Sequence, residues 1–130
     1  MSVWVDTNVL VRFITRDDAE QSKRVLSVMR RAERGEITIR VSAIVVAEVI
    51  WVLRSVYGYA PNAIADALRA FLIADGVSVE EEDVVIEALR LAQQGVGFVD
   101  GYVAALARSR REPVLTFDAG FKRLGVEIFA

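Results

Sequence analysis

The stretch Ile37–Leu53 reads ITIRVSAIVVAEVIWVL and contains the pattern that decides the fold. Its first part, Ile37–Val41, is rich in β-branched side chains and predicts a strand. Ser42 is a good helix N-cap, and the apolar run after it predicts a helix that ends near Gly58. A strand that passes directly into a helix is the unit from which parallel α/β sheets are built.

The same alternation of strand and helix continues along the whole chain. Further strands are predicted at Val3–Val5, Val77–Val79, Pro113–Phe117 and Val126–Phe129. Helices are predicted at Asn8–Ile14, 17–34, Pro61–Ala74, 80–94, Phe98–Ser109 and Ala119–Leu124. This pattern indicates an α/β fold, a three-layer sandwich with a short, mostly parallel five-stranded sheet flanked by helices. No linker-like tract or internal repeat interrupts it, so we expect a single domain over residues 1–130.

The composition excludes several classes of chemistry. The chain has no cysteine and no histidine, which removes disulfides, thiolate nucleophiles, thiolate-bound zinc, serine–histidine triads and imidazole-ligated metals. Chemistry must therefore depend on carboxylates, hydroxyls, lysines or a bound ion. The net charge of −2 argues against a large electrostatic surface for nucleic acid. It does not exclude an enzyme that acts on nucleic acid.

The apolar residues give expectations about location and core. No apolar stretch reaches the roughly 18 residues that a membrane-spanning helix needs, because Glu48 and Arg54 interrupt the longest one. No secretory signal is visible at the N-terminus, so a cytoplasmic location is expected by default. The hydrophobic content of 54% suggests that a partner covers part of the apolar surface. Four aromatic residues are expected in the core: Trp4, Trp51, Phe71 and Phe98.

Glu48 is the one polar side chain within the apolar segment Ala43–Leu53. One helical turn away lie the apolar side chains of Ile44, Val45, Trp51 and Val52, so no cation reaches Glu48 locally. We therefore expect it to be half-buried among apolar groups. An ionised carboxylate in such a place is costly unless it is paired, protonated or bound to a metal.

Three further carboxylates follow apolar runs: Asp6 after VWV, Asp100 after GFV and Asp118 after VLTF. In parallel α/β sheets, ligands bind beyond the carboxyl ends of the strands, so these acids and Glu48 can converge there. Two carboxylates about 4 Å apart repel by about 4 kcal/mol at an effective dielectric constant near 20. A divalent cation offsets this repulsion, and a set of carboxylates favours Mg²⁺ or Mn²⁺. The sequence therefore predicts a metal site.

Two polar residues flank the predicted metal ligands. Asn8 lies two positions after Asp6, and Thr116 two positions before Asp118. Both can orient the ligands or a metal-bound water from a second layer around the ion.

Structural roles for the same four acids remain open. Asp6 can cap the helical turns that follow it, and Asp118 can cap Ala119–Leu124 and pair with Lys122. Asp100 can interact with the dipole of its own helix. A distant arginine can neutralise Glu48, and the candidates are Arg12 and Arg40.

Four motifs together resemble the PIN domain family. They are VDTNVL at Val5–Leu10, SAIVVAE at Ser42–Glu48, FVDGYVAALA at Phe98–Ala107 and LTFD at Leu115–Asp118. They occur in the order that the family shows, and the similarity covers essentially the whole chain. Within the family, the chain is most similar to the toxin component of VapBC toxin–antitoxin pairs.

The resemblance implies a metal-dependent endoribonuclease whose substrate is RNA. Carried over by position, Asp6, Glu48, Asp100 and Asp118 form the acidic quartet around Mg²⁺ or Mn²⁺, and Asn8 and Thr116 are its polar companions. It also implies a homodimer and a cognate antitoxin whose C-terminal segment covers the acidic groove. Two features depart from the family: Gly101 and Tyr102 follow the third acid, where an alanine and an aliphatic residue are common, and the net charge is acidic for a nuclease.

Two rival functions make different predictions. A receiver or phosphatase-type phosphotransfer domain also places acids at the ends of strands. The phosphatase needs a second aspartate where this chain has Asn8, and the receiver needs an acidic pair near its N-terminus and a lysine after a late strand. Neither pattern is present. The other rival is a non-catalytic PIN-like binding domain, and such domains usually lack some of the four acids.

Overall fold

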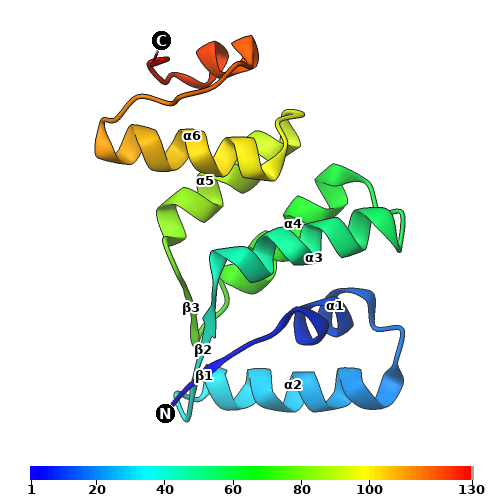
Figure 1. Cartoon of the computed structure of the whole chain (residues 1–130). Coiled ribbons are helices and arrows are strands. Elements are labelled where there is room, and N and C mark those ends of the chain that lie inside the picture. The colour runs from blue at the N-terminus through cyan, green and yellow to red at the C-terminus, as the bar shows by residue number, and fades with distance from the viewer. Residues whose placement is uncertain (130) are drawn as a thin grey trace. The chain divides into compact units, whose positions relative to one another are not determined.

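The computed structural model describes residues 1–129 of the chain and divides it into two compact units. The first unit is Met1–Glu81 and the second is Glu82–Ala130. Figure 1 shows the alternation of strands and helices in the first unit and the helical character of the second. The single domain expected from the sequence stays a prediction.

The first unit contains a parallel sheet of three strands in the order β1-β2-β3. The strands are β1 (Ser2–Trp4), β2 (Thr38–Val41) and β3 (Val77–Val79). Their register aligns Val3 with Ile39 and Ile39 with Val77. The helices between the strands are α1 (Thr7–Thr15), α2 (Ala19–Glu33), α3 (Ala43–Ser55) and α4 (Pro61–Leu72). The chain thus has the predicted α/β class, with a parallel sheet flanked by helices.

The predicted helix starts correspond to local capping interactions. The side chain of Asp18 accepts a hydrogen bond from the backbone N–H of Gln21, and that of Ser42 accepts one from Val45. Pro61 occupies the first turn of α4, where its missing N–H costs nothing. These residues fix where the helices begin and therefore where the strands before them end.

Gly76 is required where β3 begins. Its φ is +82°, and a Cβ atom placed there would lie 2.4 Å from the carbonyl oxygen of Ala32 at the end of α2. A side chain of any size is excluded by this contact, and the left-handed backbone favours glycine as well. The close approach lets β3 pass the end of α2.

The second unit consists mainly of two helices that pack together, α5 (Glu82–Gln93) and α6 (Phe98–Arg110). At Gly101 of α6 an added Cβ atom would lie in ordinary contact, 3.5 Å from Ala88 and Leu91, so the two helices have room for a methyl group there. The 3₁₀ helix η1 (Ala119–Leu124) follows. A small core is formed by Ala104, Val114 and Phe121, with Ala107, Leu124, Val126 and Ile128 packed against it.

The prediction of five strands is wrong for residues 1–129, because the sheet has three. The segments predicted as the last two strands meet in one isolated parallel bridge, between Val114 and Ile128. Val114 makes both of the hydrogen bonds there, donating to Glu127 and accepting from Phe129. Pro113 before it has no N–H to extend the pairing.

The aromatic residues divide between core and surface. Phe71 and Phe98 are buried as predicted, with 1% and 9% of their surface exposed. The core prediction is wrong for Trp4 and Trp51, which are 62% and 64% exposed. Trp4 points away from the face of β1 that carries Val3, since side chains alternate along a strand. No helix within residues 1–129 is both long and apolar enough to cross a membrane.

Candidate functional site

Asp6 lies just beyond the end of β1 and is the N-cap of α1. Its Oδ1 atom accepts a hydrogen bond from the backbone N–H of Val9 at 3.2 Å, and its side chain is exposed. The capping role expected as an alternative is therefore present. It occupies one carboxylate oxygen and leaves Oδ2 without a hydrogen bond in the described part of the chain.

Glu48 lies in the middle of α3 and is exposed, so the expectation of a half-buried carboxylate is wrong. The buried face of α3 is formed by Val46, Val49 and Leu53. Glu48 lies on the opposite face, where Ile44 and Trp51 are 79% and 64% exposed. Because α3 is apolar on both faces, its sequence does not indicate which face points outward.

Asp100 and Asp118 belong to the second unit, and both are exposed. Asp100 lies in the first turn of α6, where its charge interacts favourably with the helix dipole. Asp118 is the N-cap of η1, and its Oδ1 accepts a hydrogen bond from the N–H of Gly120 at 2.8 Å. The predicted cap is thus present, whereas residues 1–129 contain no ion pair between Asp118 and Lys122.

The predicted quartet is divided equally, with Asp6 and Glu48 in the first unit and Asp100 and Asp118 in the second. Taken by itself, neither unit brings three described acidic side chains close enough together to hold a metal ion. None of the four forms an ion pair within residues 1–129, so neither Arg12 nor Arg40 neutralises Glu48. Exposed carboxylates with unoccupied oxygens are suitable ligands for Mg²⁺ or Mn²⁺.

The two predicted polar companions have different surroundings. Thr116 is partly buried, and its Oγ1 accepts a hydrogen bond from the backbone N–H of Asp118 at 2.9 Å. It therefore fixes the turn that presents Asp118. Asn8 is exposed in the first turn of α1, two residues beyond Asp6.

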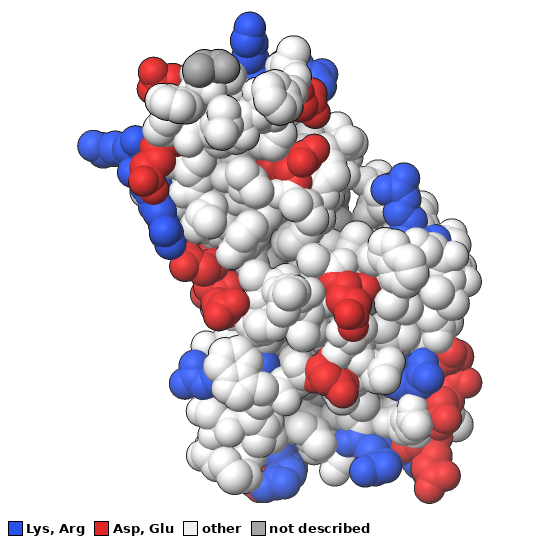
Figure 2. Space-filling model, viewed as in Figure 1, with Lys and Arg blue, Asp and Glu red and all other residues white. Residues whose placement is uncertain are grey.

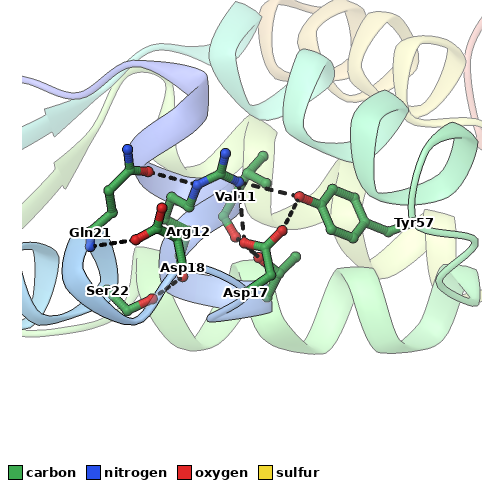
Figure 3. Close-up of polar contacts among 8 residues, drawn as sticks. Val11, Arg12, Asp17, Asp18, Gln21, Ser22 and Tyr57 are labelled. Carbon is green, nitrogen blue, oxygen red and sulfur yellow. Dashed lines mark hydrogen bonds and ion pairs between the residues drawn. The ribbon is translucent and has the colours of Figure 1, made fainter.

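A polar network joins α1 to the segment that follows α3 (Figure 3). The Tyr57 hydroxyl donates to Asp17 Oδ2 at 2.7 Å and accepts from Arg12 Nη1 at 3.2 Å. Arg12 Nη1 also contacts Asp17 Oδ1 at 3.3 Å, and Arg12 Nε donates to Gln21 Oε1 at 2.8 Å. We call these four residues the Arg12 network. Since α1 carries Asp6 and α3 carries Glu48, the network ties together two elements of the proposed site.

Sequence reasoning did not find the Arg12 network. The sequence places Asp17 only at the start of the helix predicted over residues 17–34, whereas the structure pairs it with Tyr57, forty positions away in the chain. Hydrogen bonds from Tyr57 and then Thr15 lower the pKa of Asp17, and the charge of Arg12 contributes less. No local pattern in the sequence contains a signal for such a distant contact.

A cavity of about 400 Å³ lies beside Asp6 in the first unit. Asp6, Asn8 and Arg12 contribute to its lining, and so do residues of α2. The sequence predicted no cavity, although the apolar spacing along α2 shows which face of this helix is turned inward.

Charges of both signs are mixed over the visible face of the molecule (Figure 2). Lysines and arginines occur there singly or in small groups between acidic residues, and they form no extended basic surface on that face. This agrees with the net charge of −2.

Comparison with known proteins identifies a family and similar solved structures. The family model described as PIN domain matches residues 3–127. Among solved structures, the chain is similar to one in the crystal structure of VapBC2 from Rickettsia felis bound to a DNA fragment from their promoter. The identity is 19%, the alignment covers 99% of this chain and 98% of that chain, and the TM-score is 0.41. No curated protein matches.

Proposed function

The chain belongs to the PIN domain family, and on this premise we propose that it is a metal-dependent endoribonuclease that cleaves RNA phosphodiester bonds. PIN domains are typically nucleases. The observation that carries the proposal is that all four acids of the family pattern are present, exposed and without ion pairs within residues 1–129.

We assign different roles to the four carboxylates. Asp6 and Asp100 would bind Mg²⁺ or Mn²⁺ directly, and Glu48 or Asp118 would either ligate through water or accept the proton of the attacking water. When bound, the ion polarises the phosphodiester and stabilises the charge that develops on it. Asn8 and Thr116 would orient these groups. Since the chain has no histidine, the leaving oxygen takes its proton from water.

Replacing the proposed ligands tests this function directly. We expect Asp6→Asn and Asp100→Asn to abolish magnesium-dependent cleavage of total RNA, because each removes a charge that binds the ion. Asparagine keeps the capping ability of Asp6, so the fold should be preserved, as judged by circular dichroism. Asp75→Asn is the matched control, since Asp75 is exposed and outside the motifs. Cleavage by both ligand variants at the wild-type rate would remove the assignment.

Metal binding distinguishes the nuclease from a non-catalytic PIN-like domain. In calorimetry with Mn²⁺, we expect the wild type to bind the ion and Glu48→Gln to bind it several-fold more weakly. Binding to neither protein would favour the non-catalytic domain. Glu48 is exposed and makes no capping bond, so its substitution should leave the stability of α3 unchanged.

We further propose that the protein is the toxin of a toxin–antitoxin pair, acts in the cytoplasm and forms a homodimer. Exposed apolar residues on and beside α3 and α4 support a partner surface, namely Ile44, Trp51, Val56 and Ile73. The cognate antitoxin would cover the acidic residues and inhibit cleavage. Co-expression with the protein encoded by the neighbouring gene should abolish RNA cleavage, and light scattering of the toxin alone should give the mass of a dimer. Cleavage that persists in a purified complex would contradict the antitoxin.

A further inference from the structure

The cavity beside Asp6 has one helical face as its main wall. Residues of α2 that line it are Gln21, Arg24, Val25, Val28 and Met29, whose spacing places them on one side of the helix. Val3 of β1, Ile39 of β2 and Phe71 of α4 add further apolar surface. The wall is therefore mostly apolar. A volume of about 400 Å³ is in the range of pockets that bind small molecules.

Two guanidinium groups line this otherwise apolar cavity. Arg12 is held by Gln21, Asp17 and Tyr57 through its Nε and Nη1 atoms, while its Nη2 has no hydrogen bond within the described residues. Its side chain is 27% exposed. Arg24 forms no ion pair within residues 1–129. The cavity thus contains one cation fixed in place by its neighbours and a second that is free to move.

We propose that this cavity binds one nucleotide of the RNA substrate, with its phosphate on Arg12 and Arg24 and its base against the apolar wall. This inference rests on the proposed function. Guanidinium groups form strong paired hydrogen bonds to phosphate oxygens, and nucleotide bases favour apolar walls with a few polar groups. The Arg12 network holds one guanidinium before the ligand arrives, which reduces the entropy lost on binding.

The position of the cavity gives the nucleotide a role in cleavage. Asp6, Asn8 and Arg12 all line the cavity, so a nucleotide bound in it is near a proposed metal ligand. Binding there would place the neighbouring phosphodiester of the RNA and would favour some bases over others. Arg12 and Arg24 are therefore proposed as substrate-positioning residues.

Nucleotide binding can be measured without cleavage. We would titrate the four nucleoside 5′-monophosphates into the wild-type protein in the presence of a chelator, using calorimetry and amide NMR shifts. At least one should bind, at least about tenfold more tightly than its nucleoside or inorganic phosphate, with shifts at Gln21–Met29. Arg24→Gln should weaken binding about tenfold. Arg30→Gln is the matched control, since Arg30 is an exposed arginine on α2 outside the cavity wall, and it should bind as the wild type does.

Three results would overturn the inference: no binding of any monophosphate, equal binding by Arg24→Gln and the wild type, or binding of an acidic peptide but of no nucleotide.

Cleavage of RNA separates this inference from the proposed function. If both are correct, Arg24→Gln raises KM for RNA and leaves kcat nearly unchanged. Cleavage with no binding of nucleotides contradicts the cavity alone, whereas nucleotide binding without any metal-dependent cleavage contradicts the ribonuclease alone.

Discussion

The two units each carry two of the four acids but hold their helices together differently. In the first unit, the Arg12 network joins α1 to the segment after α3, and its Arg12–Tyr57 hydrogen bond is partly buried. In the second, α5 packs on α6 through Gly101 and small apolar side chains, and the Glu87 ion pairs to Arg90 and Arg108 lie at the surface. The largest fully buried side chains lie mainly in the first unit, so changes in side-chain volume should disturb it as well as the second.

The largest expected difference in stability is between alanine substitutions of two glycines, one from each unit. Gly76→Ala should destabilise the protein by about 3 kcal/mol, because it combines a positive φ with a Cβ position 2.4 Å from a carbonyl oxygen. Gly101→Ala should instead stabilise it by up to about 1 kcal/mol, since Gly101 is inside a helix with room for a methyl group. Urea unfolding measures both. If both substitutions change the free energy of unfolding equally, the backbone of Gly76 does not approach Ala32 as closely as the structure has it.

A smaller effect is expected from the network itself. Tyr57→Phe should cost about 1–2 kcal/mol of unfolding free energy, because Arg12 and Asp17 each lose a hydrogen-bond partner. Tyr59→Phe is the matched control, because no hydrogen bond to the Tyr59 hydroxyl is present in residues 1–129. It should change stability by less than about 0.5 kcal/mol. If the two variants are equally stable, the network contributes nothing to the first unit.

The smallest expected effects concern how stability depends on pH through two acids, Asp17 and Glu87. The hydrogen bonds from Tyr57 and Thr15 lower the pKa of Asp17, and the hydrogen bond from Arg90 lowers the pKa of Glu87. A lowered pKa in the folded state stabilises the protein above the unfolded value, which is 3.8 for Asp17 and 4.5 for Glu87. That stability is lost as the pH falls through the folded pKa.

Asp17→Asn and Glu87→Gln should therefore be less stable than the wild type at pH 7, and both differences should shrink below pH 4. Urea unfolding between pH 7 and pH 2.5 tests this. Added salt should reduce the Glu87 difference more, since the partners of Glu87 are charged arginines, whereas those of Asp17 are chiefly hydroxyl groups. If the difference in stability between a variant and the wild type stays constant over this pH range, the substitution does not affect stability through the charge of the carboxylate.

The sequence predicted the elements best where a local interaction defines their ends. Asp18, Ser42 and Pro61 mark helix starts by their own chemistry, and the structure begins α2, α3 and α4 beside them. The outward face of α3 could not be predicted, because apolar residues surround Glu48 on all sides and burial of one face depends on tertiary packing. The same holds for Trp4, whose exposure depends on which face of β1 is covered.

The sequence predicts which residues form the candidate site but not how they are arranged in space. Motifs identify Asp6, Glu48, Asp100 and Asp118 because each follows or interrupts an apolar run. The contacts around them depend on residues far away in the sequence, as Tyr57 and Asp17 show. The short strands near Val114 were overpredicted because apolar alternation does not ensure a neighbouring strand with which to pair.

The cap at the start of α1 limits how Asp6 can serve as a ligand. One of its oxygens accepts the Val9 N–H, so the other oxygen, Oδ2, is the one that Asp6 offers most freely to a cation while the first turn of the helix stays intact. Glu48 keeps both oxygens available and can chelate in bidentate fashion. The two carboxylates of the first unit thus differ in how many unoccupied oxygens they offer to a cation. Replacing Asp6 with glutamate would lengthen the side chain but remove the cap at the start of α1.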